Sequence, residues 1–189
     1  MSRFRGLPPL VAFVALAALA CSSSGPFTIP PGYTPAGSPN GVVIVRTELL
    51  TADGSPFTAG PARATLRWHH EESGKDVVLE AANEGPLADF WVSLPGGHYR
   101  MVATRGDGVA QRWYVLRFRV EPGAVVYAGA IHVVAPDNSS FTLEDEYDAA
   151  VARFRASHAE LADGVKKSLV ELLRCRTGSP CEPQSWPAS

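Results

Sequence analysis

Between residues 41 and 134 the chain consists of short stretches in which apolar and polar residues alternate. The pattern is clearest at 62–69, where Leu66 and Trp68 fall on one side of an extended backbone and basic residues fall on the other. A period of two residues indicates a strand with one buried face. Turn-forming Pro and Gly residues separate the stretches, at 95–97, 106–108 and 121–123. About seven strands are therefore expected in this region.

The expected fold is mainly β, a single antiparallel β-sandwich of about seven strands over 41–134. No helical pattern interrupts these strands, which argues against parallel βαβ units. Aromatic residues at inward positions supply the core, each burying on the order of 150–250 Å²: Trp68, Phe90, Tyr99, Tyr114 and Phe118.

The apolar spacing changes to a helical period over 142–176. One stripe has steps of four, three and four residues: Tyr147, Val151, Phe154 and His158. A second stripe follows it: Leu161, Val165, Leu169 and Leu172. Thr142 and Asp145 have the spacing of a capping box. The pattern predicts two amphipathic helices, followed by a tail at 177–189. An apolar helix face usually packs on its own domain, so covering the sandwich is favoured over docking a partner.

The N-terminal 20 residues have the layout of a secretory signal peptide. A short basic start precedes 14 largely apolar residues, 7–20, which end in small residues before Cys21. A spanning helix needs about 20 residues, so this stretch is short for a membrane anchor. The cysteine directly after the small residue resembles a bacterial lipobox, in which a signal peptidase cuts before a lipidated cysteine. Cys21 is therefore the expected lipidation site, and a plain secretory signal cut after Ala20 is the nearest alternative.

Residues 21–40 are rich in Pro, Gly and Ser and contain few large apolar side chains. Such a composition predicts an extended linker between the lipid and the domain. At about 3.1 Å per residue, the 19 residues from 22 to 40 reach up to roughly 60 Å.

Charge and cysteine content limit the classes of function. Without the signal peptide, 15 basic residues stand against 19 acidic ones, which is not the balance of a nucleic-acid binder. Once Cys21 carries lipid, Cys175 and Cys181 remain, on either side of a turn-like segment. In an exported protein such a pair predicts a disulfide, worth roughly 2–3 kcal/mol in the loop-closure model.

A resemblance to a known family is carried by residues 90–100, FWVSLPGGHYR. They look like the Leu-Pro-x-Gly-x-Tyr turn of carboxypeptidase-regulatory-like, or transthyretin-like, domains, which are small β-sandwiches. Residues 123–129, GAVVYAG, are similar to the final strand of related envelope lipoproteins. The resemblance implies an Ig-like or transthyretin-like sandwich with a non-catalytic role in adhesion, folding support or assembly.

No catalytic residue, metal ligand or cofactor is predicted. The chain contains no G-x-S-x-G, P-loop, G-x-G-x-x-G or H-E-x-x-H motif. His69 and His70 are consecutive strand residues that point to opposite faces, so they do not share an ion. Five histidines, at 69, 70, 98, 132 and 158, define no general base by spacing alone.

The sequence thus predicts a lipoprotein of the bacterial cell envelope with a non-enzymatic accessory or binding role. Its expected partners are the membrane, through the lipid, and an envelope protein or glycan, with no nucleic acid. An alternative is a glycan- or peptidoglycan-recognition module that uses exposed aromatics such as Trp91 or Trp113. Ser22 after the cysteine is typical of outer-membrane lipoproteins, which predicts an outer membrane location facing the periplasm or the cell surface.

Overall fold

A computed structural model describes residues 27–58, 65–80, 85–106, 111–134, 141–176 and 179–184. The predicted signal peptide and Cys21 lie outside these ranges. The first seven strands are β1 (Asn40–Leu50), β2 (Thr65–His70), β3 (Lys75–Glu80), β4 (Leu87–Pro95), β5 (Gly97–Gly106), β6 (Gln111–Val120) and β7 (Val125–Val134). The later elements are β8 (Phe141–Glu144), α1 (Tyr147–Arg155), α2 (Ala159–Ala162), β9 (Val165–Lys167), β10 (Glu171–Arg176) and β11 (Ser179–Gln184).

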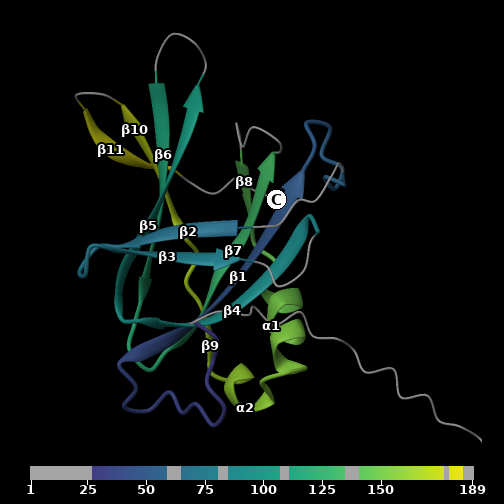
Figure 1. The fold of residues 1–189 in the computed structure, drawn as a ribbon, viewed down its shortest axis with the longest axis vertical. Coiled ribbons are helices and arrows are strands. Elements are labelled where there is room, and N and C mark those ends of the chain that lie inside the picture. Colours follow the sequence, from purple (N-terminus) through teal and green to yellow (C-terminus); the bar gives the residue numbers. More distant parts are fainter. Residues whose placement is uncertain are drawn as a thin grey trace, which may run out of the picture.

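The described strands form two sheets, and the fold is mainly β (Figure 1). The first sheet has the order β4-β1-β7-β8. β9 also pairs with β7, at residues 125–127, whereas β8 pairs with residues 130–133. The second sheet has the order β11-β10-β6-β5-β2-β3. The prediction of about seven strands over 41–134 is confirmed in number, because β1 to β7 occupy this region.

Side chains from both sheets meet in one apolar core. Trp68 of β2 and Phe118 of β6 pack edge to face with ring centroids 4.5 Å apart, and Tyr99 stacks on Phe118 at 5.3 Å. Val43 and Val45 of β1 belong to the same cluster. Of the aromatics expected to face inward, four are buried: Trp68, Phe90, Tyr99 and Phe118. The side chain of Tyr114 lies outside the described part of the structure.

The pairing is mixed, which corrects the expectation of a purely antiparallel sheet. β1 runs parallel to β7, and β7 runs parallel to β9. Parallel neighbours need a long crossover connection, which is usually a helix. Here the crossover from β1 to β7 contains strands of the second sheet, and the residues described between these two strands include no helix.

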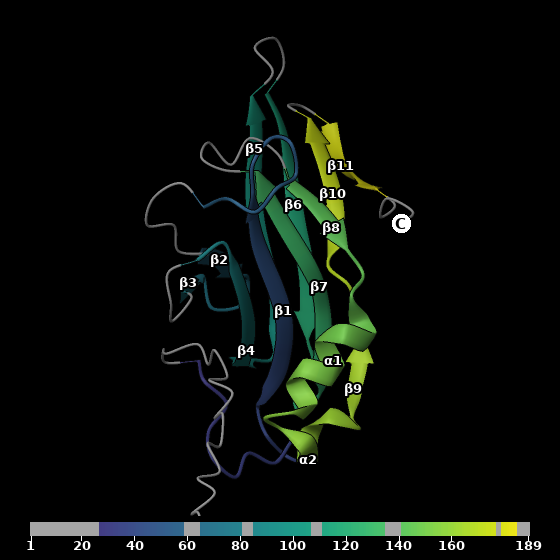
Figure 2. The ribbon, with the colours of Figure 1, turned by 90° about the vertical axis from the view of Figure 1, so that its right-hand side faces the viewer.

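The opposite face of the first sheet is covered by α1 and α2 (Figure 2). Val42 and Ile44 of β1 pack with Tyr127 of β7 and Phe154 of α1 in a second apolar cluster. β1 therefore buries one set of alternating residues against the second sheet and the other set under the helices. This explains its nearly continuous apolar sequence, VVIV.

The second predicted helix is wrong beyond residue 162. Val165 lies in β9 and Leu172 in β10, so only 159–162 of that region are helical. β9 pairs with β7, and β10 pairs with β6. Each of these strands offers an unpaired row of backbone hydrogen-bonding groups, and pairing with them outweighs a helical stripe that is only about three turns long.

The predicted capping box is also not formed, because Thr142 lies in β8 and α1 begins at Tyr147. Instead, the backbone N–H of Glu146 donates to the Tyr127 hydroxyl at 2.8 Å. Burial raises the pKa of Tyr127 to about 12, so its hydroxyl stays protonated at neutral pH.

Two expected irregular segments are ordered in the structure. The backbone N–H of Ser93 donates to the carbonyl of Phe27 at 2.7 Å, and Thr28 forms a bridge with Val92. Phe27 packs on the inter-sheet core. The linker prediction is therefore wrong for 27–39, because apolar side chains in this stretch find sites on the domain. The tail prediction is wrong for 179–184, which form β11.

Candidate functional site

Charged residues gather on the helix-covered face of the first sheet, beside α1. This cluster, here called the His132 cluster, consists of Arg46, Glu48, Asp89, His132, Glu144, Glu146 and Arg153. β1, β4, β7 and β8 supply five of these residues, Glu146 immediately precedes α1, and Arg153 lies in the last turn of α1. The outward-facing residues of β1 change here from apolar to charged, so the face that is dry under α1 becomes polar beyond it.

A bulge in β7 aims His132 at this cluster. Tyr127 pairs with Ile44 and Gly129 pairs with Val45, which leaves Ala128 as an extra residue. Gly129 has φ +121°, a conformation that residues with a side chain rarely adopt. An extra residue reverses the alternation that follows it. His132 therefore shares a face with Tyr127 and lies beside Glu48, its neighbour in register on β1.

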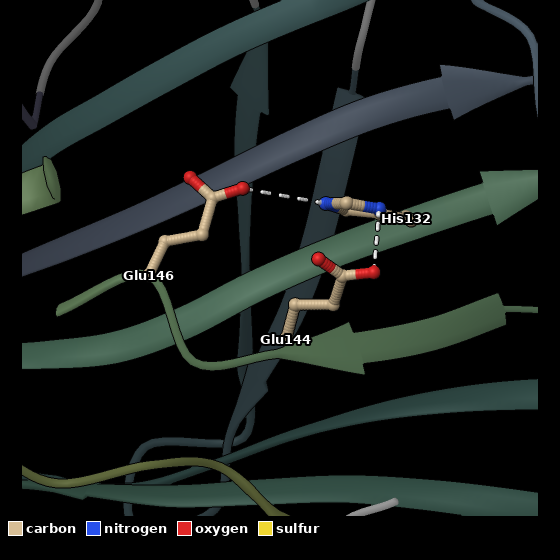
Figure 3. Close-up of side chains that lie close together, drawn as sticks. All are labelled: His132, Glu144 and Glu146. Carbon is tan, nitrogen blue, oxygen red and sulfur yellow. Dashed lines mark ion pairs between the residues drawn. The ribbon is translucent and has the colours of Figure 1, made fainter. Parts of the chain in front are cut away.

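His132 is buried but makes long contacts to three carboxylates. Figure 3 shows two of them, those of Glu144 and Glu146. The Nδ1 of His132 lies 3.7 Å from Glu144 Oε1, and its Nε2 lies 3.9 Å from both Glu146 Oε1 and Glu48 Oε2. The His132 side chain is 9 % exposed, and Nε2 has no hydrogen-bond partner. A buried polar atom without a partner costs about 1–3 kcal/mol, so this nitrogen requires an explanation.

Two arginines hold the far side of Glu146. Arg46 and Arg153 approach its Oε2 at 3.0 and 3.4 Å, and Arg153 also contacts Asp89 at 3.2 Å. The other oxygen of Glu146 is the one that faces His132. The arginines therefore fix the orientation of this carboxylate and leave one oxygen available toward the histidine.

A second polar cluster lies at the turn between β2 and β3. Glu72 Oε2 accepts from the backbone N–H of His98 at 2.8 Å and lies 3.2 Å from His70 Nε2, while Glu72 Oε1 contacts His98 Nδ1 at 2.7 Å. His70 Nδ1 contacts Ser73 Oγ at 2.7 Å. A side chain at Gly97 would collide with His70 and Glu72, so glycine is needed here.

The contacts of Ser73, His70 and Glu72 have the pattern of a hydrolytic triad. No sequence motif indicated this arrangement. Ser73 and Glu72 are exposed in a short turn. The serine is three residues from the histidine, as in an ordinary side-chain contact within a turn. His70 Nε2 also faces the carbonyl of Gly96 at 3.3 Å, so the ring connects two adjacent turns. His69, on the opposite face, contacts Asp76 at 2.9 Å.

A change in Glu72 should alter the acid dependence of stability. Hydrogen bonds from His98 lower the pKa of Glu72 from 4.5 to about 2. A carboxyl whose pKa is lower in the folded state stabilises it fully above pH 4.5, and this contribution is lost as the pH falls toward 2. We expect the difference in free energy of unfolding between the wild type and Glu72→Gln to be largest above pH 5 and to vanish near pH 2.

Urea unfolding between pH 2 and pH 6 measures this difference. Glu71→Gln is the matched control, because Glu71 lies in the same turn as Glu72 and makes only a 3.8 Å contact with Arg100 of β5. A pH-independent difference for Glu72→Gln, or an equal pH dependence for Glu71→Gln, would contradict the assignment.

The residues predicted from sequence fall in different places. Cys175 and Cys181 are joined by a disulfide with an S–S distance of 2.01 Å, as expected. Cys21 lies outside the described residues. Trp91 is not an open binding platform, because it packs edge-on against Phe154 and His158. The side chain of Trp113 lies outside the described part of the structure.

The His132 cluster was not predicted, although one signal was present. Glu144 and Glu146 are two residues apart at the end of a strand, a spacing that places both on one side. Acids at this position also favour the N-terminus of a helix, which is the more ordinary interpretation. Among the residues that the structure describes, no helix has both the length and the apolar character needed to span a membrane. Comparisons of the chain with protein-family models, curated proteins and solved structures found no match.

Proposed function

We propose that this chain is a lipoprotein of the bacterial cell envelope, with a lipid on Cys21 and a non-enzymatic accessory or binding role. In this proposal the two sheets form a β-sandwich of the Ig-like or transthyretin-like kind. The shared apolar core between the sheets supports the architecture. The Leu94–Tyr99 turn also supports it, because Tyr99 is buried in that core and donates to the carbonyl of Pro95 at 2.8 Å.

The observation that carries the proposal is the basic start, apolar stretch and small residues that precede Cys21 in this order. The docking of Phe27 on β4 sets how far such an anchor would let the domain reach. Only residues 22–26 separate Cys21 from this fixed point. An extended chain spans at most about 3.6 Å per residue, so six steps reach roughly 20 Å. A lipid on Cys21 would therefore hold the domain close to the membrane surface. This is a much shorter reach than an extended linker over 21–40 would allow.

The disulfide supports an exported location. Stable disulfides form in oxidising compartments and are rare in the cytosol. Cys175 and Cys181 close a short hairpin between β10 and β11. The pair lies within this hairpin, where the pairing of the two strands shifts register between Arg174 and Arg176.

The non-enzymatic part of the proposal rests on the two polar clusters. Ser73 lies in an exposed turn, and its contact with His70 follows from the local geometry of that turn. The carboxylates around His132 all lie 3.7 Å or more from its ring nitrogens, and its Nε2 accepts no hydrogen bond from a hydroxyl group. Labelling of Ser73 by a fluorophosphonate would contradict this part of the proposal.

The anchor is tested by Cys21→Ser in a bacterial host. We expect the wild type to be recovered in membranes with a cleaved, acylated N-terminus. The variant should be released to the soluble fraction or remain as an uncut precursor, because the modified thiol is missing. Fractionation with intact mass measurement distinguishes these forms. Cys181→Ser is the control and should stay in the membrane. A Cys21→Ser variant that is processed and partitions into detergent like the wild type would overturn the proposal.

A further inference from the structure

We propose that His132, Glu144 and Glu146 bind a divalent transition-metal ion, with Glu48 as a fourth ligand. One ligand atom from each of His132, Glu144 and Glu146 can be chosen so that all three lie within 4.8 Å of one another. Ligand atoms around zinc lie about 2.0–2.2 Å from the ion, so two of them are at most about 4.4 Å apart. The spacing between the ligand atoms here is therefore slightly wider than in an occupied site. Closing this group onto an ion requires the carboxylates to approach the ring, and Glu146 already presents its Oε1 to His132.

The unpartnered nitrogen of His132 is the first argument for an ion. Its ring is nine-tenths buried and faces carboxylates on both sides, yet Nε2 makes no hydrogen bond. Other histidine–carboxylate contacts in the described structure are much shorter, since His98 and His69 lie 2.7 and 2.9 Å from their carboxylates. The distances of 3.7–3.9 Å at His132 leave space between the ring and the acids.

The charge balance of the His132 cluster is the second argument. Four carboxylates, from Glu48, Asp89, Glu144 and Glu146, stand against two guanidinium groups. The four carboxylates exceed the two guanidinium groups by two charges, part of them on groups withdrawn from water. Bringing like charges together is unfavourable, and a divalent cation compensates for this excess.

The donor set favours a transition metal over calcium or magnesium. Imidazole nitrogen suits zinc and related ions, whereas calcium and magnesium prefer oxygen ligands throughout. Glu144 is 55 % exposed, so an ion has access from solvent along this side. A bound ion would connect β1, β7 and the segment that links β8 to α1, so binding should stabilise the fold. This site does not depend on the lipid anchor.

The test is titration of the full chain with Zn²⁺ in detergent by calorimetry, together with the midpoint of thermal unfolding. All proteins carry Cys21→Ser, so that a free thiol does not bind zinc. We expect one ion per chain and a higher midpoint with Zn²⁺, with no comparable effect of Ca²⁺. His132→Gln and Glu144→Gln should each weaken Zn²⁺ binding at least about tenfold.

His98→Gln is the matched control, because it removes a histidine–glutamate contact elsewhere and should leave Zn²⁺ affinity unchanged. Glu144→Gln keeps the test decisive if His132→Gln fails to fold, since Glu144 is largely exposed. Absence of Zn²⁺ binding to the parent chain overturns the proposal. So does full affinity in Glu144→Gln, or a loss of binding in His98→Gln that matches the loss in the cluster variants.

Discussion

Replacing Tyr99 by alanine is expected to lower the free energy of unfolding by about 3–5 kcal/mol, the cost typical of removing a large aromatic side chain from a core. Tyr99 is fully buried, stacks on Phe118 and His70, and donates its hydroxyl to Pro95. Burial raises the pKa of Tyr99 above its ordinary value, so the hydroxyl remains a donor at neutral pH. The residue therefore joins core packing to the geometry of the turn before it.

Tyr99→Phe separates the two contributions. It keeps the ring and leaves the carbonyl of Pro95 without its donor, which should cost about 1–2 kcal/mol. Urea unfolding at neutral pH measures both variants. Equal losses in Tyr99→Phe and Tyr99→Ala would mean that packing contributes little, which would contradict the role of Tyr99 as a core residue.

The second large effect is expected for Phe154→Ala, with a loss of about 3–5 kcal/mol. Phe154 is fully buried between α1 and the first sheet, where it stacks on His158 and meets Trp91 edge-on. The short helix α1 has little stability of its own and depends on this packing. Loss of the ring should therefore release α1 as well as open a cavity.

Thermal unfolding and helical circular dichroism measure this effect. Arg155→Ala is the control, because Arg155 is exposed and contributes only a surface ion pair with Asp163, for which less than about 1 kcal/mol is expected. Phe154→Leu should fall between the two, since it keeps most of the apolar volume. If Phe154→Ala is as mild as Arg155→Ala, then α1 does not depend on the sheet.

Local patterns in the sequence predicted the strands better than their partners. Residues 65–70 alternate cleanly, and such a segment forms a half-buried strand wherever it lies. The parallel pairing of β1 with β7 depends on which edges are available after the other strands have formed, and no local spacing records this. The second apolar stripe illustrates the same limit. Val165 and Leu172 fit a helix, but open edges of β7 and β6 make them strand residues.

The His132 cluster was hidden for a similar reason. Glu48 and His132 are far apart in sequence, and each has the appearance of an ordinary strand residue. Alternation counted from Tyr127 would place His132 on the opposite face, and the bulge at Ala128 reverses that assignment. Cys175 and Cys181 were predictable because they are close in sequence and few pairings were available.

The position of β1 has a consequence for how the chain folds. β1 is the first strand, yet it lies at the centre of the first sheet, between β4 at 87–95 and β7 at 125–134. β9, at 165–167, completes the sheet from still farther along the chain. Contacts between residues so distant in sequence form slowly, because a long loop must close before the contacts stabilise it. A chain that emerges N-terminus first therefore exposes the apolar segment VVIV until most of its length is present. Protection of this segment during synthesis or export is a requirement that the topology itself imposes.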